Sequence, residues 1–140
     1  MKHLIALVIA INVGLITSSA NAHDGDHDDA PGMVQAPKGG EIKSMEEAYI
    51  EVLSRKGEVS IYFYQKDLKP VTDLKRFTVS AEAQLPRSKV MTPLVLKESG
   101  THLTTSFDAK SAHRYTLVLK VKDSKFDHGD RLNFTIEPRR

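Results

Sequence analysis

The chain contains no cysteine and no tryptophan, and aromatic residues make up only 6% of its 140 residues. The missing thiols exclude disulfide bonds, thiolate metal ligands, a cysteine nucleophile and a lipid-modified cysteine. A formal net charge of only +2 gives little long-range attraction for a polyanion, so we expect no nucleic-acid partner. A folded domain in this chain must therefore be stabilised by its core rather than by covalent cross-links.

Long hydrophobic runs are also scarce, and the longest lies at the N-terminus. Lys2 precedes the apolar segment 4–16, and Ala20-Asn21-Ala22 has the small-x-small pattern that a signal peptidase recognises. The apolar segment is shorter than the ~20 residues that span a bilayer. We therefore expect residues 1–22 to be a cleaved signal peptide. The mature chain would start at His23, have no membrane span and be periplasmic or secreted.

The expected mature N-terminus is rich in histidine and aspartate. His23 would offer both its free amine and its imidazole to a metal ion, and His27 adds a second imidazole. The carboxylates of Asp24 and Asp26 can complete the coordination shell. This composition predicts a site for Cu(II) or Zn(II). The alternative is an acidic tail that only keeps the protein soluble.

Residues 23–37 are rich in Asp, Gly, Ala and Pro and show no apolar periodicity, so we expect a flexible leader there. From Lys38 onward, apolar residues recur at every second position in short runs that turn residues interrupt. This spacing is typical of half-buried strands and predicts one all-β domain over residues 38–140. The runs are residues 49–53, 59–64, 77–83, 90–96, 103–107, 115–122 and 132–136.

Seven or eight short strands with turns about every ten residues favour an immunoglobulin-like β-sandwich, with a small β-barrel as the alternative. Alternation predicts that Ile61 and Phe63 are buried, together with Leu117 and Leu119 from a later run. Glu51 lies among apolar neighbours. We expect its carboxylate to pair with a lysine or arginine on an adjacent strand.

Residues 39–71 carry a family resemblance. The order comprises Gly39-Gly40, Tyr49-Ile50-Glu51-Val52, Gly57, the run 59–64, and Asp67 followed by Lys69-Pro70-Val71. It resembles the small periplasmic β domains that occur alone or fused to membrane-fusion subunits of heavy-metal efflux pumps. Lys38 stands where that family often has histidine. The resemblance implies periplasmic handling of copper or zinc, with an efflux subunit as a partner.

A terminal histidine is also similar to that of periplasmic copper-binding β-sandwich proteins, in which the first residue ligates copper beside an Asp and a His from a later loop. In this chain Asp127-His128 lies in the polar segment 125–130, and we expect His128 to be the ligand that the folded domain supplies. The alternative is a polar turn with an exposed histidine.

Motifs for catalysis are missing from the sequence. It has no Gly-x-Ser-x-Gly elbow, no His-Glu-x-x-His and no phosphate-binding loop. We therefore expect a protein that is not an enzyme and that binds or presents a transition metal. The alternative function is an adhesive or interaction domain whose exposed edge strands bind another protein.

Overall fold

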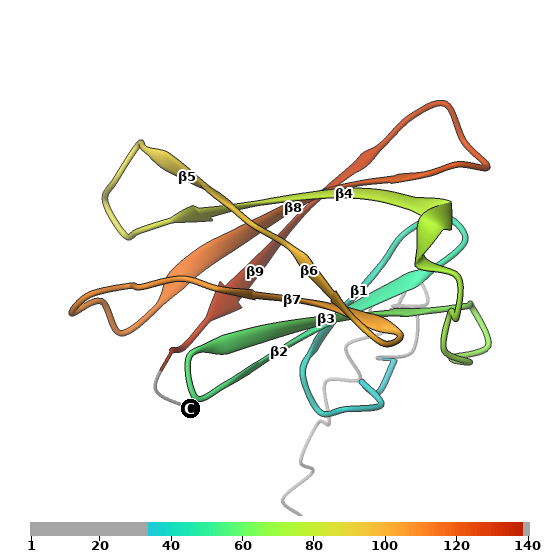
Figure 1. The fold of residues 1–140 in the computed structure, drawn as a ribbon, viewed down its shortest axis with the longest axis horizontal. Helices are drawn as coiled ribbons and strands as arrows, with labels where there is room; N and C mark the ends of the chain where they lie inside the picture. Colours follow the sequence, from blue (N-terminus) through green and yellow to red (C-terminus); the bar gives the residue numbers. More distant parts are fainter. Residues whose placement is uncertain (1–33, 139–140) are drawn as a thin grey trace, which may run out of the picture. The chain divides into compact units, whose positions relative to one another are not determined.

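The computed structural model describes residues 34–138, which form two antiparallel β-sheets (Figure 1). The five-stranded sheet has the order β1 (Glu41–Ser44), β2 (Tyr49–Arg55), β3 (Glu58–Tyr64), β7 (His102–Ser106) and β6 (Lys97–Ser99). The four-stranded sheet has the order β5 (Met91–Leu94), β4 (Phe77–Gln84), β8 (Tyr115–Asp123) and β9 (Asp130–Ile136). A single 3₁₀ turn, η1 (Leu74–Arg76), precedes β4. The described residues contain no helix that could cross a bilayer.

The strand order is that of an immunoglobulin-like sandwich with one added strand. Without β1, the order β2-β3-β7-β6 in one sheet and β5-β4-β8-β9 in the other corresponds to A-B-E-D and C′-C-F-G. The predicted all-β sandwich is confirmed. The barrel alternative is wrong, because both sheets end in free edge strands instead of closing on themselves.

Two strand predictions need correction. β1 is an additional edge strand on β2, in a segment that shows no alternating run. The predicted strand 90–96 is interrupted: the chain leaves β4 after Leu94 and joins the other sheet at Lys97 (Figure 1). Val95 lies between the two and is 75% exposed. Pro93 is tolerated because β5 is an edge strand, where an amide on the side away from β4 would have no ladder partner to lose.

The predicted core positions are confirmed. Ile61, Phe63, Leu117 and Leu119 are each at most 1% exposed. The ring of Phe63 stacks on Phe77 with centroids 4.8 Å apart. Because Phe63 is in the five-stranded sheet and Phe77 in the four-stranded one, this contact joins the two layers. Other buried members of the core are Ile50, Val52, Val59, Ala81, Val121, Phe134 and Ile136.

A buried ion pair ties η1 to the end of β8. The Nε of Arg76 donates to both carboxylate oxygens of Asp123 at 2.9 Å, and its Nη2 donates to Oδ2. The amide of Lys125 also donates to Asp123, at 3.0 Å. Asp123 is only 3% exposed, and the Arg76 guanidinium holds the pKa of its carboxyl below the usual range. The pair therefore favours the folded state wherever Asp123 is ionised.

Replacing Phe63 by alanine tests the inferred core. A large side chain removed from a close-packed site leaves a cavity, so we expect a loss on the order of 3 kcal/mol in the free energy of unfolding. Urea denaturation followed by circular dichroism measures it. The matched control is Val95→Ala at an exposed position, where a change within about 0.5 kcal/mol is expected. Equal effects of the two substitutions would place Phe63 outside the core.

Replacing Asp123 by asparagine tests the ion pair. The variant leaves the Arg76 charge without its partner, so we expect it to be roughly 3 kcal/mol less stable at neutral pH. Because the pKa of Asp123 is lowered in the folded state, this difference is complete above the unfolded pKa near ~3.9. It shrinks as the pH falls through the lower folded-state pKa. Urea denaturation of both proteins over a pH series measures it, and a difference independent of pH would contradict the assignment.

Candidate functional site

The structure reaches only part of the predicted metal site. His23, Asp24, Asp26 and His27 lie outside the described residues, as do the predicted signal peptide, residues 1–22, and most of the predicted leader. His128 is described, in the loop between β8 and β9. The site can therefore be built only from the side of the folded domain.

His128 lies beside an acidic side chain that the sequence did not point to. Its Nε2 is 3.2 Å from the Oε2 of Glu46, and the two side chains are 63% and 54% exposed. The imidazole ring also packs against the ring of Phe126, with centroids 5.7 Å apart. Glu46 follows β1, so this contact joins the β8–β9 loop to a segment more than eighty positions earlier in the chain.

The surroundings of this pair do not complete a metal shell. A cavity of about 10 Å³ lies beneath it and is also lined by Glu47, Asp123 and Asp130. That volume is about what a single water molecule needs. Asp123 is already occupied by Arg76. Among residues 34–138, no group of three or more His, Asp or Glu side chains is placed to hold a metal ion. His128 and Glu46 thus offer at most two ligands of a larger set.

A second arrangement surrounds the Gly-Gly turn that carries the resemblance. Glu51 is fully buried, although strand alternation puts it on the outer face of the five-stranded sheet. Its Oε1 accepts hydrogen bonds from the amides of Lys38 at 2.9 Å and Gly40 at 2.7 Å. Its Oε2 accepts the Tyr64 hydroxyl at 2.9 Å and again the Lys38 amide at 3.1 Å. These hydrogen bonds hold the N-terminal segment, residues 38–40, against the outer face of the five-stranded sheet.

The prediction that Glu51 pairs with a lysine or arginine on an adjacent strand was therefore wrong. Backbone amides and a tyrosine hydroxyl bind the carboxylate, where a lysine or arginine was predicted. Burial and the hydrogen bond to Glu51 raise the pKa of the Tyr64 hydroxyl above its usual range. The clue in the sequence was the Gly-Gly pair upstream of a glutamate flanked by apolar residues. The Gly-Gly turn and this glutamate are in contact, through the hydrogen bond that the Gly40 amide donates to Glu51.

Glycine is required in this turn for two reasons. Gly39 has a φ of +80°, which side chains disfavour. At Gly40 a Cβ would lie 2.3 Å from the carbonyl oxygen of Val52.

The Asp67–Pro70 part of the resemblance is also structural. The Lys69 amide donates to Asp67 at 3.1 Å, and Pro70 forms a bridge with Tyr64.

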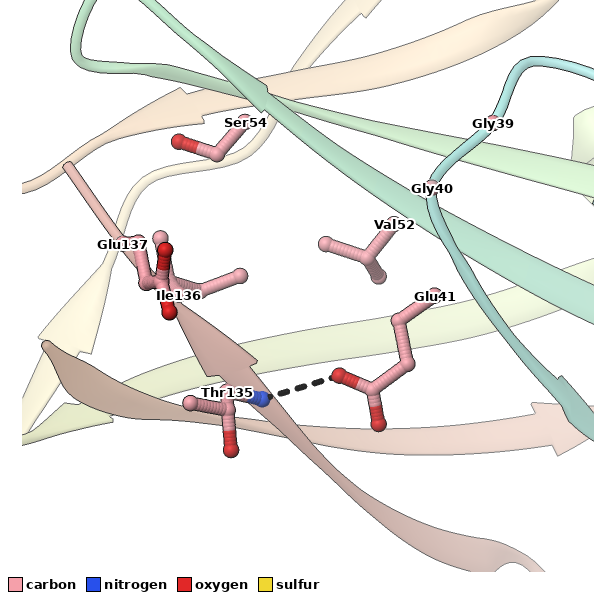
Figure 2. A pocket seen from close by; sticks show the side chains of 8 residues that line it. All are labelled: Gly39, Gly40, Glu41, Val52, Ser54, Thr135, Ile136 and Glu137. Carbon is pink, nitrogen blue, oxygen red and sulfur yellow. Dashed lines mark hydrogen bonds between the residues drawn. The ribbon is translucent and has the colours of Figure 1, made fainter. Parts of the chain in front are cut away.

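A hollow of about 360 Å³ opens beside the Gly-Gly turn, between the edge of β1 and the end of β9 (Figure 2). Glu41 accepts a hydrogen bond from the Thr135 amide at 3.1 Å and pairs with Lys43 at 3.1 Å. Figure 2 shows the side chains of Val52 and Ile136 extending toward each other across the hollow. Glu41 thereby covers an amide on the free edge of β9, as inward-pointing charges commonly do on edge strands.

Two hydroxyls near this end of the sandwich have no hydrogen-bond partner among the described residues. They are Ser54 Oγ, beside the hollow, and Thr105 Oγ1. Ser54 and Thr105 are both opposite Val59, on β2 and β7, so they share one row of the inner face. Unpaired buried hydroxyls carry a desolvation cost, and water reaching them through the hollow would relieve it.

Replacing Glu51 by glutamine tests whether its hydrogen bonds hold the N-terminal segment, residues 38–40, against the sheet. Glutamine offers one acceptor oxygen in place of two and points an NH₂ group toward backbone donors. We expect a loss of roughly 2 kcal/mol in the free energy of unfolding and faster hydrogen exchange of the Lys38 and Gly40 amides. The matched control is Glu58→Gln, at an exposed position of β3. Unchanged stability and exchange in Glu51→Gln would show that these hydrogen bonds do not fasten the segment.

Comparisons with known proteins identify no family for this chain. No family model matches it, and no curated protein matches it. Among solved structures, the chain is similar to a DUF4426 family protein from Pseudomonas aeruginosa PAO1. The two have 16% sequence identity and a TM-score of 0.48, and the match covers 69% of this chain and 94% of the other.

Proposed function

We propose that this chain is an exported, non-catalytic protein that binds a transition metal through its mature N-terminus, in the service of a metal-efflux system. The observation that carries the proposal is the donor set of the terminus, where His23 would supply an amine and an imidazole and His27 a second imidazole. Two nitrogens from one terminal residue form a chelate ring, and nitrogen-rich sites of this kind prefer Cu(II) over Zn(II) and Ni(II).

The folded domain contributes one suitable group to this proposal. His128 has an exposed imidazole beside the Glu46 carboxylate, which can accept a hydrogen bond from the imidazole N–H or share a metal ion with it. The other described histidines are less suited. His102 stacks on Tyr62 with centroids 4.7 Å apart, and His113, which precedes β8, forms no ion pair with a carboxylate of residues 34–138. His128 is therefore the residue through which the domain would complete a site.

The residues that carry the family resemblance would support the fold rather than the metal. Glu51 is occupied by the amides of Lys38 and Gly40, and Lys69 pairs with Asp67 at 2.6 Å. Lys38 itself, which replaces the family's histidine, lies over the ring of Tyr62 at 5.6 Å. Metal binding in this chain would thus have to come from the leader and His128.

The alternative role as an interaction domain has less support. β9 is a seven-residue edge strand and would be the longest edge open to an added strand. Its Thr135 amide, however, is already bonded to Glu41, which lies across the seam on β1. A peptide could pair along β9 only after displacing this contact.

Calorimetric titration of the secreted protein with Cu(II) tests the proposal, after intact mass has confirmed a chain that starts at His23. An alanine added ahead of His23 breaks the chelate ring, and His27→Ala removes the second imidazole. We expect each to weaken Cu(II) binding at least about tenfold, the effect that the loss of an outer-shell partner already has. Protons compete for the same nitrogens, so affinity should fall as the pH drops through the imidazole range near ~6.5.

His113→Ala is the matched control, because it removes an imidazole outside the proposed site. Unchanged affinity in both leader variants would leave the leader as a solubilising tail and refute the proposal. If His128→Ala alone weakens binding, the site belongs to the folded domain and the terminal chelate is wrong.

A further inference from the structure

Basic side chains gather on the outer face of the four-stranded sheet. Ser80, Lys120 and Arg131 are directly opposite one another on β4, β8 and β9, so they form one row. Lys122 lies two residues further along β8 on the same face, opposite Thr78. We call Lys120, Lys122 and Arg131 the basic cluster. All three are exposed.

The strand register places like charges of the basic cluster next to each other, which lowers the stability of the sheet. Lys120 and Arg131 are a direct cross-strand pair of like charge, which destabilises an antiparallel sheet. Glu82 relieves part of the repulsion by pairing with Lys120 at 2.9 Å. Within residues 34–138, no carboxylate forms an ion pair with Lys122 or Arg131. Two positive charges of the cluster are therefore available to an external anion.

The cluster surrounds a shallow hollow of about 370 Å³. Thr78 and Ser80 bring hydroxyls to it, and the methylene stems of the basic residues supply an apolar floor. Gly129 also lines the hollow and has no side chain to fill it. The one carboxylate among the lining residues is Asp130, which strand alternation places on the opposite face from Arg131.

We propose that the basic cluster binds the phosphate groups of an anionic phospholipid surface. Cations with hydroxyl donors beside them are suited to phosphate oxygens. The exposed, open geometry favours a surface over free phosphate, because a surface presents several phosphates at once and can engage the two unpaired cations, Lys122 and Arg131, together. Each basic residue near an anionic membrane contributes enough attraction to change binding about fivefold. The contact is peripheral and uses none of the proposed metal ligands.

Vesicle sedimentation with the purified mature chain tests this proposal. The probes are vesicles of phosphatidylcholine alone and vesicles in which a third of the lipid is phosphatidylglycerol. We expect binding to the anionic vesicles only, weakening as salt is raised. The double variant Lys122→Gln/Arg131→Gln should bind about 25-fold more weakly, with unchanged circular dichroism because both side chains are exposed.

The matched control is Lys56→Gln/Lys97→Gln, which removes the same charge from exposed positions outside the cluster. Near-normal binding of this control supports a local site. Three outcomes overturn the proposal: no binding of the parent protein to anionic vesicles, equal losses in both double variants, or binding abolished by inorganic phosphate at constant ionic strength. The last of these would make the hollow a site for free phosphate.

Discussion

The buried carboxylate of Glu51 is the constraint on which the N-terminal half of the domain depends. A charge with no exposure on a sheet face is tolerable only when donors surround it, and here two backbone amides and one hydroxyl do so. The donors come from the Gly-Gly turn and from β3, so the carboxylate joins three segments. It binds the amides of Lys38 and Gly40, directly before β1 starts at Glu41.

Other polar contacts join the remaining parts of a domain that has no disulfide. Arg76 and Asp123 connect η1 to the β8–β9 hairpin, and Glu41 connects the edges of β1 and β9. Lys43 lies over the ring of Phe134 at 5.2 Å and extends this seam. The Arg76–Asp123 and Glu41–Thr135 contacts join segments 47 and 94 positions apart in the chain. Polar contacts thus connect edges and loops, while the core holds the two layers together.

The residues proposed to bind a metal ion or phospholipid lie outside the motif that carries the family resemblance. The Gly-Gly turn, the glutamate of β2 and the Lys-Pro turn interact with the domain itself. Groups free to meet a ligand lie elsewhere, at His128 and in the basic cluster on the opposite sheet. A motif can therefore mark a fold without marking its site. The two proposals rest on different side chains and can be tested separately.

Sequence alone determined the fold class and the core, because alternation with a period of two is a local property of each strand. Ile61, Phe63, Leu117 and Leu119 were all found by it. The donor chemistry of the leader is likewise available only from the sequence, since those residues lie outside the described range.

Tertiary structure decided which strand pairs with which and therefore which side chains meet. The hydrogen bonds of Glu51 span 13 positions or fewer, and the contact between Glu41 and Thr135 spans 94. The split of residues 90–96 between two sheets, the pairing of His128 with Glu46 and the like-charge row on β8 and β9 all follow from strand register. A local pattern cannot specify these, because register depends on the joint packing of distant segments.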